Sequence, residues 1–177
     1  RLRAAAGDVD AAVRVARYAV ERAPEDPDAL EQLASLYADI GDAGGLEPIV
    51  VRLQTRVPDR VASRYYAAAL HFMRGQLPMA LELAKSAIES APRHAQAHNL
   101  RGAIYARQGL VPSARDAFQV ALQLDPHDTS AYANLALLEL ETGHPANAAR
   151  LFSEVLSLDP SSTTGRDGLA RARAAAR

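Results

Sequence analysis

The sequence predicts an all-α protein, an array of antiparallel helix pairs, and three observations support this fold class. Pro24, Pro58, Pro92, Pro126 and Pro160 are spaced 34 residues apart without interruption. A fixed period of this length is typical of stacked helical hairpins, in which each unit packs against its neighbours. The composition is rich in alanine, the strongest helix former, and aromatic residues make up only 5%. Apolar residues also recur at three- and four-residue spacings, as they do along one face of a helix.

The stretch 95–128 shows the unit in its most complete form. Gly109 marks a turn over 107–110 between two helices, because glycine adopts a left-handed backbone at low cost. Pro112 then falls where the second helix should begin, a position that tolerates its missing N–H. The second helix ends before Pro126, since the residue preceding a proline avoids the helical region. Its apolar stripe consists of Ala114, Ala117, Phe118, Ala121 and Leu122.

The period divides the whole chain into six segments. We expect a partial repeat over 1–26 (mainly its second helix), full repeats over 27–60, 61–94, 95–128 and 129–162, and a last helix over 163–177. The chain starts part-way through a repeat and without methionine, so we interpret it as a piece of a longer protein whose compartment, cytoplasm or periplasm, stays open.

The last helix follows the good capping residues Ser161, Ser162 and Thr163. It carries four arginines away from Leu169, namely Arg166, Arg171, Arg173 and Arg177. Terminal units of repeat arrays need a polar outer face. We therefore interpret 163–177 as a capping helix, with the first helix of a further repeat as the alternative.

One stretch, Gly44-Gly45-Leu46-Glu47-Pro48, departs from the pattern. Glycine disfavours a helix by about 1 kcal/mol relative to alanine, and an interior proline by about 3 kcal/mol. We expect a longer turn here, with Pro48 in the first turn of a shortened second helix. Local sequence drift explains this irregularity most simply, and a functional hinge is the alternative.

Charge and composition exclude several function classes. The net charge of −1 and pI near 6.6 give no indication of nucleic acid or an anionic membrane as partner. The absence of cysteine excludes disulfides and thiolate metal sites. No apolar run approaches the roughly 18 residues of a membrane span. Lys85 is the single lysine among 20 basic residues, a skew that favours a GC-rich, bacterial gene.

The sequence predicts neither catalysis nor a cofactor. It contains no phosphate-binding glycine loop, no H-E-x-x-H and no G-x-S-x-G. The best metal candidate is His94 with His98, spaced i,i+4, but a third ligand is missing and His94 is expected to precede the helix. We interpret the two histidines as capping or packing residues and predict no metal site.

These features resemble the tetratricopeptide repeat family. In 95–128 the signature positions match Gly102, Tyr105, Gly109, Ala114, Phe118, Ala121 and Pro126, while His98 and Arg101 replace an aromatic residue and a leucine. The copy at 129–162 matches with Tyr132, Leu135, Ala136, Gly143, Ala148, Phe152 and Pro160. The resemblance covers essentially the whole chain. It implies a right-handed superhelical solenoid whose first helices line a concave groove, and a non-catalytic scaffold that binds other proteins.

The resemblance also implies which residues face the groove. An apolar strip contains Tyr65, Ala69, Phe72, Met73, Ala103, Ala106, Leu137 and Leu140, and the polar groove positions include Asn99, Arg107 and Asn134. We expect this strip to bind a peptide or an amphipathic helix of a partner protein. The alternative is that Phe72, Met73 and Leu140 pack against neighbouring helices. Acidic residues at one end, Asp28, Glu31 and Asp39, favour a basic flank on the ligand.

Two known binding modes of the family are not expected. The basic clamp of chaperone-binding members is missing, since its positions hold Glu31, Ser35, Tyr66, Gln96 and Leu100. Glycosyltransferase-linked arrays carry an asparagine ladder at the sixth position of each unit; Asn134 fits, but Asn99 is one residue off. Two other functions stay open: a regulatory or substrate-docking segment of a larger enzyme such as a glycosyltransferase, and a self-association module.

Three charged residues, Arg64, Arg101 and Glu139, occupy positions that the family fills with apolar groups. A charge left unpaired between helices is costly, so each should pair or reach solvent. We predict that Arg101 pairs with Glu139 between neighbouring first helices. The alternative is that Arg101 extends to solvent along its aliphatic stem.

Overall fold

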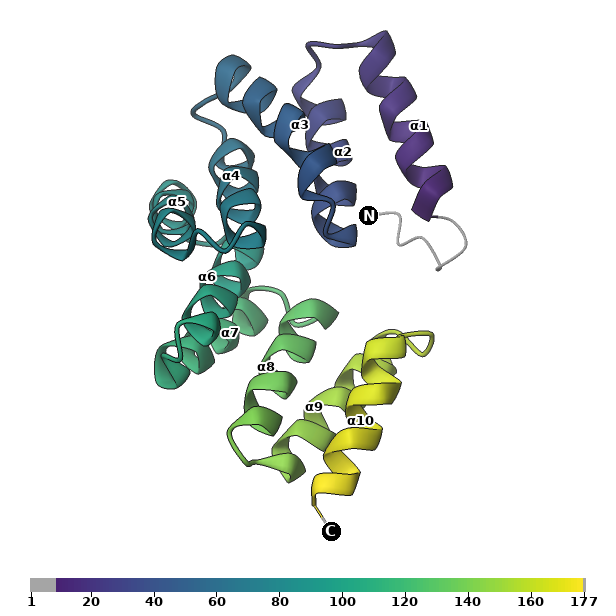
Figure 1. The fold of residues 1–177 in the computed structure, drawn as a ribbon, viewed down its shortest axis with the longest axis vertical. Helices are drawn as coiled ribbons and strands as arrows, with labels where there is room; N and C mark the ends of the chain where they lie inside the picture. Colours follow the sequence, from purple (N-terminus) through teal and green to yellow (C-terminus); the bar gives the residue numbers. More distant parts are fainter. Residues whose placement is uncertain (1–8, 177) are drawn as a thin grey trace. The chain divides into compact units, whose positions relative to one another are not determined.

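The computed structural model describes residues 9–176 and shows ten α-helices and no strand in that range (Figure 1). The helices are α1 (Val9–Arg22), α2 (Pro27–Ile40), α3 (Ala43–Arg56), α4 (Val61–Met73), α5 (Leu77–Ser90), α6 (Ala95–Arg107), α7 (Val111–Leu124), α8 (Thr129–Glu141), α9 (Pro145–Leu158) and α10 (Thr163–Ala175). Helices α2 to α9 pack as consecutive pairs, α2 with α3 through α8 with α9. The predicted all-α fold of helix pairs is confirmed. Residues 1–8 of the partial repeat and Arg177 lie outside the described residues.

The turn inside each pair contains a glycine in the left-handed region of the backbone. Gly41, Gly75, Gly109 and Gly143 have φ angles of 75°, 72°, 76° and 80°. The residue after each glycine donates its N–H to a carbonyl five residues earlier, as from Leu110 to Tyr105 at 2.9 Å. This bond belongs to the Schellman motif, which satisfies carbonyls at the end of the first helix. The turn predicted at Gly109 is confirmed, and it recurs once in every pair.

The chain divides into two compact units, 1–91 and 92–177, each with its own hydrophobic core. In the first unit α2 contacts α4; in the second, α6 contacts α8 and α8 contacts α10. The core of the first unit contains Leu30, Leu33, Leu46, Ile49, Val50, Leu53 and Leu70 among others. The core of the second contains Phe118, Leu135, Leu138, Leu151 and Phe152. The first helices of neighbouring pairs therefore form a continuous face within each unit.

Helix α10 is the last helix of the second unit within the described residues. Ser162 precedes it, and its hydroxyl accepts the N–H of Gly165 at 3.1 Å, as the capping residues predicted. The helix packs against α9 and α8 through its buried residues Gly165, Gly168 and Ala172. Its arginines within the described range, Arg166, Arg171 and Arg173, are exposed. This polar outer side is what a capping helix requires.

The prediction of a longer turn at residues 44–48 and a shortened second helix is wrong, as α3 shows. It runs for 14 residues from Ala43, as long as α5, α7 and α9, and contains both glycines and Pro48. Asp42 caps it, accepting the Gly45 N–H at 2.9 Å. A Cβ at Gly45 would lie 2.4 Å from Cε1 of Tyr37, so the glycine lets α2 pack closely on α3. Tertiary packing thus outweighs the low helix propensity of this stretch.

Within the described residues, no helix is both long enough and apolar enough to cross a membrane.

Candidate peptide-binding faces of the two units

In the first unit, α4 supplies the aromatic part of the predicted strip. The rings of Tyr65 and Tyr66 stand 5.0 Å apart, edge to face at 64°. Tyr65 and Phe72 are half-buried, whereas Met73 packs against the core of this unit. Ala69 is buried, with 7% exposure, so it shapes the floor of this face rather than its surface. The alternative of core packing therefore holds for Met73.

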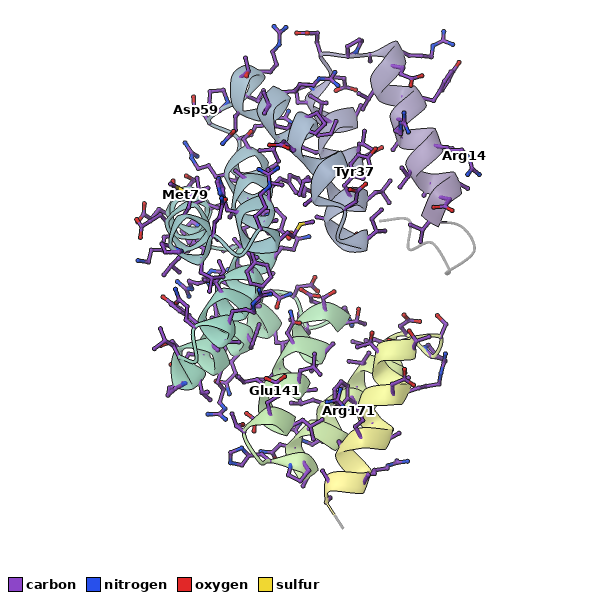
Figure 2. All side chains as sticks on the ribbon, in the orientation of Figure 1. Arg14, Tyr37, Asp59, Met79, Glu141 and Arg171 are labelled. Atoms are coloured by element: carbon purple, nitrogen blue, oxygen red, sulfur yellow. The ribbon has the colours of Figure 1, made fainter. Side chains whose placement is uncertain are left out.

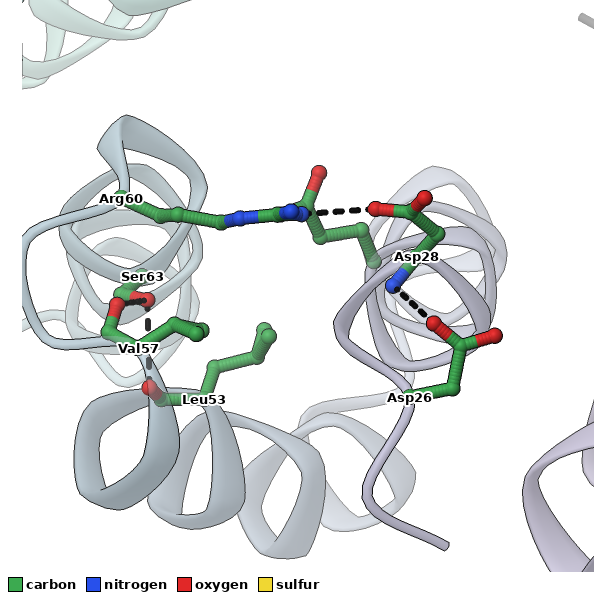
Figure 3. Close-up of polar contacts among 7 residues, drawn as sticks. Asp26, Asp28, Leu53, Val57, Arg60 and Ser63 are labelled. Carbon is green, nitrogen blue, oxygen red and sulfur yellow. Dashed lines mark hydrogen bonds and ion pairs between the residues drawn. The ribbon is translucent and has the colours of Figure 1, made fainter. Parts of the chain in front are cut away.

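The acidic end of this unit carries its own cation. Nη1 of Arg60, just before α4, donates to Oδ1 of Asp28 on α2, with 2.7 Å between nitrogen and oxygen (Figure 3). The same nitrogen donates to Oε1 of Glu31, also on α2, at 2.9 Å. Hydrogen bonds to Asp28 and Glu31 raise the pKa of the Arg60 guanidinium above its usual value. Two of the three carboxylates expected to attract a basic ligand are thus already paired.

A polar link joins the first helices of the second unit. Asn134 of α8 donates through Nδ2 to Oδ1 of Asn99 on α6, at 3.0 Å. Both side chains are half-buried. Within the described residues, neither the Asn99 Nδ2 group nor the Asn134 Oδ1 atom has a hydrogen-bond partner. The pair therefore offers a donor group and an acceptor side by side, although the two asparagines occupy different positions in their repeats.

Small apolar residues accompany this asparagine pair. Ala103 and Ala106 on α6, with Leu137 and Leu140 on α8, are half-buried and pack against the core of the second unit. Arg107 is exposed at the end of α6. Together these side chains form a half-buried apolar surface beside the side-chain amides of Asn99 and Asn134. Leu140 packs against the core, as the alternative interpretation of this residue expected.

The predicted ion pair between Arg101 and Glu139 is wrong. Buried Glu139, 5% exposed, accepts from Nε of Arg115 on α7 at 2.6 Å and from Nδ2 of Asn147 on α9 at 3.3 Å. Arg101 instead donates through Nη2 to Nδ1 of His98 at 3.2 Å. A half-buried arginine from the preceding second helix thus reaches the carboxylate, which leaves no need for Arg101.

The Glu139 site is electrostatically favourable for a carboxylate. Burial by itself raises the pKa of Glu139, but hydrogen bonds from Arg115 and Asn147 and the charges of Arg115 and His144 lower it below its usual value. His144 Nδ1 lies 3.6 Å from Glu139 Oε2. The residue holds α7, α8 and the start of α9 together.

The two candidate histidines have structural roles. His94 caps α6, its Nδ1 accepting the Ala97 N–H at 3.1 Å. His98 is buried, and its Nε2 lies 2.9 Å from the carbonyl oxygen of Pro92, which requires a proton on Nε2. The interpretation as capping and packing residues is confirmed. No group of three or more metal-binding side chains occurs in residues 9–176.

Three residues that shape these faces were not identified from the sequence. Arg60 binds two carboxylates of α2, and Arg115 binds Glu139 of the following repeat. Ser63, 1% exposed, donates to the carbonyl oxygens of Val57 and Leu53 at 2.6 and 3.2 Å (Figure 3). The signal for Arg60 was its separation from Asp28 by 32 residues, close to one period, which places opposite charges on adjacent helices.

Comparison with known families identifies the repeat. Models of the tetratricopeptide repeat match residues 1–45, 66–129 and 129–162. The stretch 46–65, which contains Pro48, lies outside the matched ranges. No curated protein matches the chain.

Several solved structures are similar. A thermophilic TPR protein of Thermus thermophilus, TTC0263, is 26% identical, with 95% of this chain and 92% of that chain covered and a TM-score of 0.81. MamA is 21% identical, with 87% and 90% covered and a TM-score of 0.57. The first TPR of Spaghetti (RPAP3), bound to the HSP90 peptide SRMEEVD, is 17% identical, with 66% and 92% covered and a TM-score of 0.63. The helix pairs, their glycine turns and the matching family models agree, and the chain belongs to the tetratricopeptide repeat family.

Proposed function

We propose that this chain is a non-catalytic scaffold that binds a peptide or an amphipathic helix of a partner protein on the faces formed by its first helices. The asparagine pair of α6 and α8 carries the proposal. An extended peptide offers an N–H and a C=O at each residue, and Asn99 and Asn134 offer one unused donor group and one unused acceptor to meet them.

The surroundings of the pair suit a peptide. Ala103, Ala106 and Leu137 provide apolar contact while leaving room for a chain to approach. In the first unit, Tyr65 and Phe72 are half-buried aromatic groups of the kind that anchor bound segments. Tetratricopeptide folds can hold peptides, as the complex of the first TPR of Spaghetti with an HSP90 peptide illustrates.

A peptide-display selection on the 177-residue chain tests the proposal. Selected peptides should bind the wild type and lose at least about tenfold in affinity with Asn99→Ala plus Asn134→Ala, since main-chain hydrogen bonds are lost. Gln119→Ala plus Gln123→Ala, exposed on the second helix α7, is the matched control and should not change binding.

The aromatic anchors have a separate test. Tyr65→Ala plus Phe72→Ala should weaken peptides that occupy the first unit without changing the far-ultraviolet circular dichroism of the chain. Selected peptides that bind both double variants as tightly as wild type would assign the binding surface to other helices.

A further inference from the structure

Arg60 stands at a position where the chain otherwise caps a first helix. Its counterparts at 34-residue spacing, Asp26, His94, Asp128 and Ser162, each accept a backbone N–H of the helix that follows. The side chain of Arg60 makes no such bond with α4. A cap satisfies an otherwise unpaired N–H, and the N-terminal end of a helix disfavours a positive charge. Arginine at this position therefore does not help to stabilise α4.

The guanidinium of Arg60 contacts the neighbouring first helix instead. Its Nη1 donates to Oδ1 of Asp28 and to Oε1 of Glu31, and so links the start of α4 to α2 (Figure 3). This contact is open to water, because 45% of the Arg60 side chain is exposed. Exposed ion pairs contribute little to folding, whereas a missing cap is a clear loss. A gain in stability does not explain why arginine is present here.

The two carboxylates are found on α2 and not on the first helices of the three full repeats that follow. The counterparts of Asp28 at 34-residue spacing are Ala62, Gln96 and Ser130, and those of Glu31 are Tyr65, Asn99 and Ala133. None of these side chains is charged. The carboxylates and the arginine that binds them therefore occur together, at the α2 end of the face that α2 and α4 form (the α2–α4 face).

Arg60 changes what the α2 end of this face can bind. Without a counter-charge, Asp28 and Glu31 would favour a lysine or arginine of a ligand. The guanidinium of Arg60 already bonds to both carboxylates, and its charge repels a second cation. Proteins often obtain specificity by placing an unfavourable group against the wrong partner.

We propose that Arg60 is a specificity-determining residue of the α2–α4 face. It removes the preference for basic segments that Asp28 and Glu31 would create, so this face binds partner segments that are uncharged at the α2 end. The inference rests on the proposed peptide-binding function of the face and adds the charge of the ligand.

Parallel peptide-display selections on two forms of the 177-residue chain test this role. Both baits carry Asn99→Ala plus Asn134→Ala, which weakens binding to the second unit, and one also carries Arg60→Ser, which returns a capping residue to this position. Peptides selected from a random library on the Arg60→Ser bait should contain at least about twofold more arginine and lysine than those from the other bait. These basic peptides should bind at least about fivefold more weakly when Arg60 is present, and added salt should reduce this difference.

Three variants in the same background separate a local charge effect from a general one. Arg56→Ser removes the same charge from an arginine that pairs with Glu25, in the turn before α2, and should not enrich basic peptides. Arg60→Lys keeps the positive charge and should behave as Arg60 does. Adding Asp28→Asn plus Glu31→Gln to Arg60→Ser should abolish the preference for basic peptides. A purely structural role of Arg60 would not produce this dependence on ligand charge.

Two results would overturn the inference alone. One is equal enrichment of basic peptides with and without Arg60→Ser, and the other is a preference that persists after Asp28→Asn plus Glu31→Gln. Peptides recovered on the wild-type chain but on neither bait would assign binding to the second unit, and this too would overturn the inference while leaving the proposed function intact. Failure of the proposed function is distinguishable, because the wild-type chain itself would then yield no peptide.

Discussion

At the residue scale, Gly44 and Gly45 are adjacent in α3 yet stand in different surroundings. A Cβ at Gly45 would meet the Tyr37 ring at 2.4 Å, whereas one at Gly44 would have ordinary contact, 3.4 Å, with Asp42. We expect Gly45→Ala to lower the free energy of unfolding by about 1–3 kcal/mol through overpacking. Gly44→Ala should raise it by up to about 1 kcal/mol through helix propensity. Urea unfolding of both variants measures the difference, and equal effects would contradict the packing role of Gly45.

Because of Glu139, the free energy of unfolding should decrease as the pH is lowered. Because its pKa is lowered in the folded chain, its contribution is present above the ordinary value of 4.5 and is lost as pH falls through the folded pKa. Glu139→Gln should therefore cost about 2 kcal/mol at pH 7, and less below pH 4.5. Urea unfolding at both pH values tests this. Glu141→Gln, on the exposed side of α8 (Figure 2), should differ from wild type by less than about 0.5 kcal/mol.

The ion-pair and hydrogen-bond partners of single side chains were the hardest feature to predict from the sequence. We expected Glu139 to pair with Arg101, 38 residues before it, but the partner is Arg115, 24 residues before it. Which arginine pairs with Glu139 depends on which side of α7 faces α8. The 34-residue spacing predicts which helices are neighbours, but it does not predict which side chains are close enough to form an ion pair. The bond between Asn99 and Asn134 was also missed, because their positions in the repeat differ by one.

At the element scale, Pro48 is the unusual component of α3. It is the sixth residue of the helix and has no N–H to donate to the Gly44 carbonyl. We expect Pro48→Ala to raise the free energy of unfolding by about 1–3 kcal/mol. Pro78→Ala, in the first turn of α5 where no such bond is possible, should change it by less than about 0.5 kcal/mol. Thermal unfolding of both variants compares them, and equal shifts would contradict the predicted hydrogen-bond loss.

Most elements could be predicted because their ends are encoded locally. Glycine turns, prolines at helix starts and capping residues act within a few residues of themselves, so they are visible in the sequence. Helix α3 could not be predicted in this way. Its second glycine is explained by Tyr37 of the neighbouring helix, a contact that local preference does not contain.

At the scale of the whole molecule, the two units have separate cores. Among residues 9–176, the first cluster ends at Leu83 and the second begins at Ala103. We expect residues 92–177 expressed alone to be helical and to unfold cooperatively. Circular dichroism during urea titration measures this. A fragment that loses its helicity would show that its core depends on the first unit.

The family resemblance predicted which helices form the candidate faces, but it did not predict their chemistry. Signature positions such as Gly102 and Phe118 determine packing and are shared by proteins with different partners. The proposed peptide contacts lie at positions that the signature leaves variable, Asn99 and Asn134. Their properties emerged only from hydrogen bonds and exposure.

The link between Arg115 and Glu139 constrains how this array could have grown. A tandem duplication of 129–162 would place the second copy of Glu139 after Ala149, the residue at the position of Arg115. That buried carboxylate would face a methyl group, at a cost of about 3–5 kcal/mol. Duplication of 95–162 would carry both partners together and avoid this cost. Gene duplication is therefore expected to copy these two repeats as one evolutionary block.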